Sequence, residues 1–261
     1  MEQDRIMVSL VEEKMKKCDE LQMITSSKFL DMHEKSLISA LKTPTGVFRV
    51  FFGGFSDAER TVAVFLPEYT GVKNEEELLQ YFIENDDDNP ISLLKIKKDK
   101  FSKALTHRDY LGALMGLGIK RDVIGDIKTN DDGCELVCLK NMAEYIKENL
   151  TKAGRGTLQI EIIPFSDMNA QPNNDGEEIS FTVSTVRLDS IIKNAFGISR
   201  EGACDAIEKG LVFVNDLQCF KPDKRIADGD KVVLRHKGRF IVSSSSDMSK
   251  KGRFIIKGIK Y

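Results

Sequence analysis

The chain has 261 residues, of which 41% are hydrophobic and 31% are charged, and its formal net charge at pH 7 is −2. This is the composition of a globular protein with enough apolar side chains for proper cores, which excludes a fibrous or fully disordered chain. No run of residues is long and apolar enough to span a membrane, and the first residues lead into no apolar stretch, so we expect a cytoplasmic protein.

The small net charge hides an uneven distribution of charge along the sequence. Residues 181–261 carry 16 Lys and Arg against 9 Asp and Glu, a net of +7, whereas residues 1–180 carry 23 against 32, a net of −9. A basic end on an acidic body favours docking of the C-terminal third on nucleic acid in a restricted orientation. The five cysteines include no Cys-x-x-Cys pair, which predicts reduced structural thiols and no metal site.

The first 84 residues are predicted to form an α/β region. Apolar residues at helical spacing and β-type runs give the following elements: helices over 4–24 and 31–41, and strands over 47–52 and 61–66. The loop between the two strands begins with Gly53-Gly54. It lacks the glycine spacing of a nucleotide-binding loop, so we predict a turn.

Residues 85–165 are predicted to form a ferredoxin-like domain similar to RNA-recognition modules, because their elements follow the order β-α-β-β-α-β. The predicted strands are 91–97, 123–128, 134–139 and 157–163, and the predicted helices are 106–117 and 141–150. Gly112 and Gly116 are expected to let the first helix approach the sheet closely. The central strands lack the aromatic residues on which RNA-recognition modules stack bases. RNA contact here is therefore expected only through phosphate, from Lys95, Lys97, Lys98, Lys100 and Lys103. The alternative is that these lysines form a solvated edge.

The polar stretch at residues 166–180 contains Pro and Gly and is predicted to be a linker. Beyond it, helical spacing predicts one short helix that ends before Gly197 and a second that is capped by Ser199 and ends at Gly210. Strands are predicted at 211–214 and 231–234. Two short helices followed by a small sheet resemble the S4 RNA-binding fold, which we assign to residues 181–261.

Several cations of this C-terminal part are candidates to hold phosphate. Arg187 and Arg200 open the two helices, where unpaired backbone N–H groups also favour anions. The tetrapeptide Lys-Gly-Arg-Phe occurs at residues 237–240 and again at 251–254, each time before an apolar strand. We expect a hairpin to place these turns side by side, with glycine letting the main chain approach phosphate. The alternative is that both turns are solvated hairpin ends.

Short motifs spread over residues 28–257 narrow the choice of family. They are Lys28-Phe29-Leu30-Asp31, Phe52-Gly53-Gly54-Phe55, Ala58-Glu59-Arg60, Pro67-Glu68-Tyr69, the stretch from His107 to Met115, Gly125-Asp126-Ile127, and the tail from Ser249 to Arg253. Together with the S4-like part, they resemble the YlmH family of bacterial S4-domain proteins. The resemblance implies binding to structured rRNA and tRNA on the large ribosomal subunit, in rescue of stalled ribosomes or in ribosome-associated quality control.

The resemblance also implies which residues contact RNA. They are Arg187, Ser199, Arg200, Asn215, Arg235, Lys237 and Arg239. Cys204 stands at a second-helix position that is often basic in the family. Further cations and one turn glycine complete the predicted RNA-binding set: Lys193, Lys221, Lys224, Arg225, Gly238, Lys251 and Arg253.

Two other classes of protein stay open. S4 modules are often attached to RNA-modifying enzymes, such as pseudouridine synthases and methyltransferases. Against an enzyme, the only Arg-Leu-Asp, at residues 187–189, already starts an S4 helix, and no glycine-rich cofactor loop follows a strand. The other alternative is a protein-interaction adaptor, which the basic C-terminal third disfavours. We therefore predict a non-catalytic, monomeric α+β protein without cofactor or metal.

Overall fold

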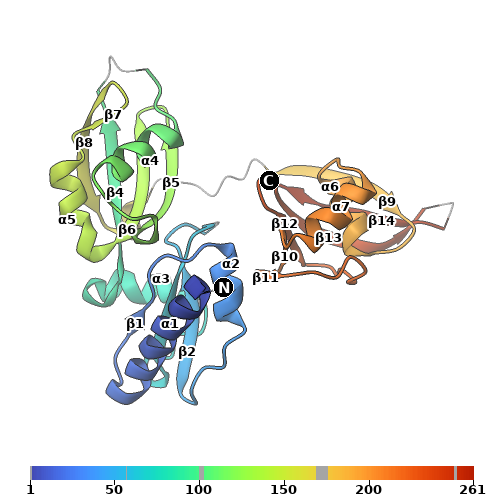
Figure 1. Ribbon diagram of the computed structural model, residues 1–261, viewed down its shortest axis with the longest axis horizontal. Helices are drawn as coiled ribbons and strands as arrows, with labels where there is room; N and C mark the ends of the chain where they lie inside the picture. Colours follow the sequence, from blue (N-terminus) through green and yellow to red (C-terminus); the bar gives the residue numbers. More distant parts are fainter. Residues whose placement is uncertain (1, 57, 100–102, 169–175, 250–251) are drawn as a thin grey trace. The chain divides into compact units, whose positions relative to one another are not determined.

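In a computed structural model, the chain divides into two compact units, residues 1–172 and 173–261 (Figure 1). The structure describes residues 2–56, 58–99, 103–168, 176–249 and 252–261. Helices and strands are mixed in both units, so the protein is of the α+β class. Of the predicted linker at residues 166–180, residues 169–175 fall outside the described residues.

The first unit begins with helices packed on a small antiparallel sheet. These elements are α1 (Glu2–Leu21), β1 (Thr25–Ser26), α2 (Met32–Ser39), β2 (Val47–Phe52) and β3 (Val62–Pro67), and the sheet order is β1-β3-β2. Asp31 caps α2 reciprocally with Glu34, since each side chain accepts a hydrogen bond from the other residue's backbone N–H. Helix α3 (Glu75–Glu84) follows, capped by Asn74, and it was not predicted from the sequence.

The second half of this unit contains a larger antiparallel sheet with the strand order β5-β6-β4-β8-β7. Its elements are β4 (Ile91–Lys98), α4 (His107–Gly116), β5 (Ile124–Asn130), β6 (Gly133–Leu139), α5 (Lys140–Asn149), β7 (Lys152–Ala153) and β8 (Gly156–Ile163). Both helices cover one face of the sheet, where Leu114 and Ile146 pack against Leu94 and Leu136. The expectation for Gly112 and Gly116 was wrong: both are exposed, and a Cβ at either would meet no atom within 4 Å.

The opposite face of the larger sheet is also buried. Leu93 and Val137 are fully buried there against Phe52, Leu78 and Phe82 of the preceding region. Residues 1–84 and 85–165 therefore share a hydrophobic core and form one unit. This shared core gives a physical reason why the central strands are aliphatic, because the sheet face opposite the two helices is an interior surface.

The C-terminal unit has two helices on one face of a sheet (Figure 1). Its elements are β9 (Glu177–Val183), α6 (Leu188–Ala195), α7 (Arg200–Glu208), β10 (Val212–Val214), β11 (Leu217–Gln218), β12 (Lys231–Leu234), β13 (Gly238–Met248) and β14 (Phe254–Lys260). The strand order is β11-β10-β12-β13-β14-β9. Gly197 and Gly210 have φ of 63° and 68°, so each adopts a left-handed conformation at a helix end that the sequence predicted.

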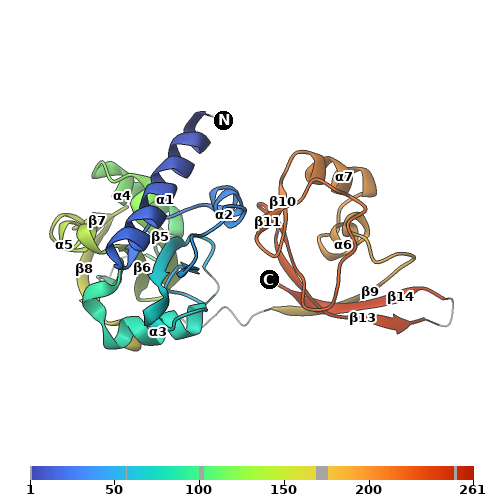
Figure 2. The same cartoon turned by 90° about the horizontal axis from the view of Figure 1, so that it is seen from below.

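Two predictions about this unit need correction. Strand β9 begins at Glu177, inside the predicted linker, because it pairs with β14 from Glu177↔Lys260 to Val183↔Phe254. The two Lys-Gly-Arg-Phe turns do not lie side by side: β13 pairs with β14 from Phe240↔Lys260 to Met248↔Phe254, which places the turns at opposite ends of the hairpin (Figure 2). At about 3.3 Å per residue, β13 separates them by roughly 30 Å.

Candidate nucleic-acid interface

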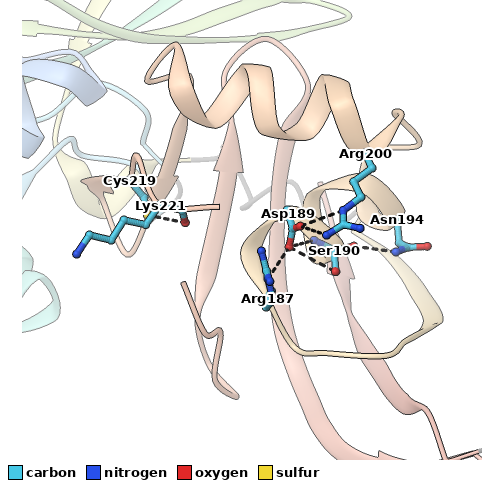
Figure 3. A network of polar contacts seen from close by, with 7 residues as sticks. All are labelled: Arg187, Asp189, Ser190, Asn194, Arg200, Cys219 and Lys221. Carbon is cyan, nitrogen blue, oxygen red and sulfur yellow. Dashed lines mark hydrogen bonds and ion pairs between the residues drawn. The ribbon is translucent and has the colours of Figure 1, made fainter. Parts of the chain in front are cut away.

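A buried carboxylate holds the two predicted helix-opening arginines together. Asp189 is only 1% exposed, and its Oδ1 lies 3.3 Å from Nε of Arg187. Its Oδ2 accepts from both Nε and Nη2 of Arg200, each at 3.3 Å (Figure 3). The arginines themselves reach solvent, with side chains that are 37% and 69% exposed. Asp189 thus fixes the position of two cations whose outer edges stay accessible.

The beginning of α6 is not a free anion site, contrary to the sequence expectation. The N–H of Leu188 donates to the carbonyl of Lys224 at 2.9 Å, and the N–H of Asp189 donates to that of Pro222 at 3.0 Å. At α7, the hydroxyl of Ser199 accepts from the N–H of Gly202 at 2.9 Å, so Ser199 is a helix cap. Any phosphate here would therefore meet the guanidinium groups first.

The segment whose carbonyls accept from the first N–H groups of α6 carries three more predicted cations. Arg187 and Arg225 form an antiparallel bridge, and the N–H of Ile226 donates to the carbonyl of Val186. Lys221 and Arg225 are exposed, and Lys224 is half-buried. We call the following five residues the α6 basic cluster: Arg187, Arg200, Lys221, Lys224 and Arg225.

A second group of predicted cations lies at the β12–β13 turn. Arg235 and Lys237 are exposed, and the guanidinium of Arg239 lies over the ring of Tyr261, 4.3 Å from its centroid. Gly238 has a φ of 107°, and a Cβ there would overlap the carbonyl oxygen of Tyr261. The backbone of Tyr261 therefore gives a structural reason for glycine at this position, and contact of Gly238 with phosphate stays a prediction.

The remaining predicted contacts are elsewhere in the unit. The amide of Asn215 donates to Asp230 at 2.7 Å and accepts from the N–H of Lys231 at 2.9 Å, so it ties a turn to β12. Lys193 is exposed in the last turn of α6. Arg253 donates to the carbonyl of Thr182 at the far end of the hairpin. Lys251, like Lys100, lies outside the described residues.

Sequence reasoning missed the role of Asp189. The signal was the tripeptide Arg187-Leu188-Asp189 followed by Arg200, in which an acid is placed between two cations. Its burial could not be foreseen, because an acid in a first helical turn is usually explained by the helix dipole alone.

In the first unit, several of the family-like motifs converge on one polar joint. The carboxylate of Asp126 accepts from the backbone N–H groups of Glu59 at 2.7 Å and Arg60 at 3.2 Å. The guanidinium of Arg60 donates to the carbonyls of Phe29 and Arg121. Burial raises the pKa of Asp126, and burial together with the charge of Arg60 lowers the pKa of Arg121 to about 10. The loop after Gly53 therefore joins the two halves of this unit.

Other kinds of site find no support in the described part of the chain. Within it, no three His, Cys, Asp or Glu side chains gather as a metal would require, and no helix has the length and apolarity to cross a membrane. Burial raises the pKa of Cys18 to about 11 and that of Cys138 to about 12, so both thiols stay protonated at neutral pH.

The geometry defines an α+β protein whose C-terminal unit presents clustered cations fixed by a buried acid. Comparison with known proteins identifies the family to which the chain belongs. The model described as "Putative RNA-binding domain in YlmH" matches residues 84–167. A relative from Bacillus subtilis (strain 168), named "Ribosome-associated protein quality control protein P2", is 32% identical over 227 residues, covering 87% of this chain and 83% of its own length. The chain belongs to the YlmH family.

One solved structure is also similar to part of the chain. It is titled "Cell division protein ylmH from Streptococcus pneumoniae", with a TM-score of 0.48 and 21% sequence identity. The similarity covers 63% of this chain and 93% of the other.

Proposed function

We propose that this protein is a non-catalytic RNA-binding protein that docks on rRNA and tRNA of the large ribosomal subunit. Its C-terminal unit, which we assign to the S4 fold on the basis of two short helices on a sheet, would make the main contact. The role would be in rescue of stalled ribosomes or in ribosome-associated quality control, and the name of the Bacillus subtilis relative supports the second. The protein would act in the cytoplasm as a monomer.

The observation that carries the proposal is the pair of arginines on Asp189. An arginine has five N–H donors, and Asp189 accepts from two of those of Arg200, so other donors of this guanidinium can meet phosphate. Because the carboxylate is buried, it orders the guanidinium groups before RNA arrives and lowers the entropy cost of binding. Lys224 and Arg225 lie beside this pair, since the carbonyl of Lys224 accepts from the N–H of Leu188 and Arg225 forms a bridge with Arg187. Lys221 is on the same segment, with its side chain directed away from the pair (Figure 3).

The middle of the chain would play a lesser role in RNA binding. We assign residues 85–165 to the ferredoxin-like plan, which the strand order β5-β6-β4-β8 supports. The family description names this region for RNA binding. Its sheet face is interior, however, and Lys97 lies 3.9 Å from Glu161, so contact here would be through phosphate and would be weak.

Sedimentation of the full chain with purified large ribosomal subunits, at increasing salt, tests the proposal. A Lys224→Ala/Arg225→Ala variant should bind more weakly and lose about two units of the slope of log affinity against log salt. The matched control is Lys16→Ala/Lys17→Ala, which removes two exposed cations from α1 and should bind as the parent does. The proposal fails if the parent does not sediment with the subunits, or if both double variants behave alike.

A further inference from the structure

An aromatic side chain is exposed within the basic C-terminal unit. Phe220 is 57% exposed and directly precedes Lys221 of the α6 basic cluster. Phe220 is not among the residues of the hydrophobic core that the helices of this unit form with the sheet.

The backbone on both sides of Phe220 is held firmly. Cys219 is buried, and its N–H donates to the carbonyl of Val212 at 2.9 Å. On the other side, the carbonyl of Pro222 accepts from the N–H of Asp189. The ring lies over Gly210, where a Cβ would be 2.9 Å from the ring's Cε1 atom. The ring therefore lies against Gly210 on an anchored stretch of backbone, while much of its surface stays open to solvent.

The charge around the ring indicates the partner. Lys221, Lys224 and Arg225 follow within five residues, against the single acid Asp223. The side chain of Lys221 extends away from the Asp189 network (Figure 3). An apolar protein partner would need a contiguous apolar patch of a few hundred Å², whereas this ring is followed by three cations within five residues. An exposed aromatic ring that is followed closely in the chain by several cations is suited to bind unpaired nucleotides, since every base has a π-face and every nucleotide a phosphate.

We propose that Phe220 is a stacking platform for one unpaired base of the bound RNA, with the neighbouring phosphates held by Lys221, Lys224 and Arg225. This rests on the proposed function and adds a second kind of contact to it. Phosphate contacts alone accept any duplex of suitable shape, whereas a stacking platform selects RNA with a bulged or unstacked nucleotide. The protein would thus prefer interrupted helices to continuous ones.

The test uses the full chain and two RNA hairpins of equal length, one fully paired and one with a single bulged 2-aminopurine. Phe220→Ala should weaken binding of the bulged hairpin about 5- to 150-fold, and binding of the paired hairpin much less. It should also remove the quenching of 2-aminopurine fluorescence that stacking causes. Phe220→Trp should restore affinity and quenching, and Leu217→Ala, which truncates another exposed apolar side chain of the unit, should change neither.

The salt dependence separates stacking from charge effects. Phe220→Ala should keep the parental slope of log affinity against log salt, whereas Lys224→Ala should reduce it by about one. If the parent binds neither hairpin, the proposed function itself fails. If the parent binds but Phe220→Ala loses no affinity, loses it equally for both hairpins, or melts at a much lower temperature, the stacking platform is refuted and RNA binding stands.

Discussion

Removal of the Arg200 side chain should separate its structural role from its role in RNA binding. Arg200→Ala deletes two N–H···O contacts of 3.3 Å to Asp189, but the carboxylate keeps Arg187 and the N–H of Ser190. Because the side chain is largely exposed, the loss should be only about 1 kcal/mol of unfolding free energy. For a unit of this size, that corresponds to a fall of roughly 4–8 °C in Tm.

The effect of Arg200→Ala on RNA binding should be larger than its effect on stability. One charge-assisted phosphate contact is removed, so affinity for a ribosomal RNA fragment should fall about tenfold. If the predicted cations meet about four to six phosphates, the parental slope of log affinity against log salt is roughly −3 to −5, and the variant's should be less steep by about one. Fluorescence anisotropy at several salt concentrations measures both quantities.

Two further variants make the interpretation specific. Arg200→Lys keeps the charge but loses the planar fork, so it should keep the slope and recover only part of the affinity. Lys209→Ala removes a cation from the other end of α7, where its ammonium pairs with Asp205 at 2.7 Å, and should leave the slope unchanged. If Arg200→Ala binds with the parental affinity and slope, the α6 basic cluster is not the RNA site, and the protein-interaction adaptor becomes the better explanation.

Three other outcomes are expected. Limited proteolysis should cut first within residues 168–176, because this polar stretch offers little apolar surface, and early cuts inside 91–163 would contradict the division into units. Gly238→Ala should lower Tm more than Gly252→Ala. Alanine at 252 adds only left-handed backbone strain of about 1–2 kcal/mol, whereas alanine at 238 adds the same strain and also a clash with the carbonyl oxygen of Tyr261. An equal fall in Tm would contradict this. Burial raises the folded-state pKa of Asp126, so the contribution of Asp126 to folding stability is most favourable at low pH and is lost as pH rises through that pKa. Denaturant titrations should therefore show the stability of the parent relative to Asp126→Asn decreasing above about pH 4, and an increase would refute the assignment.

Sequence patterns predicted the helix caps and helix ends that depend on only a few neighbouring residues. Ser199 as a helix cap and Gly197 and Gly210 as helix ends follow from backbone chemistry that a few residues determine. Helix α3 was missed although its signal was present: Asn74 caps it, and Leu78 and Phe82 repeat at helical spacing. Its three leading glutamates favour the N-terminus of a helix and should have strengthened that signal.

Features that depend on long-range pairing could not be predicted in the same way. The separation of the two basic turns depends on β13 running through the serine-rich stretch to Met248, which carries no apolar alternation to indicate a strand. The interior face of the middle sheet depends on residues 1–84 packing against it. For the same reason, the sequence identified Arg187 and Arg200 as candidate contacts but not the buried acid that positions them.

The most direct test of the central claim is ultraviolet cross-linking of the full-length protein to RNA in cells, with both the RNA sites and the linked peptides identified. We expect cross-links to rRNA of the large subunit and to tRNA, in peptides that contain the α6 basic cluster and Phe220. Cross-links confined to residues 85–165, or no cross-links to ribosomal RNA or tRNA in a cell where the protein is abundant, would contradict it.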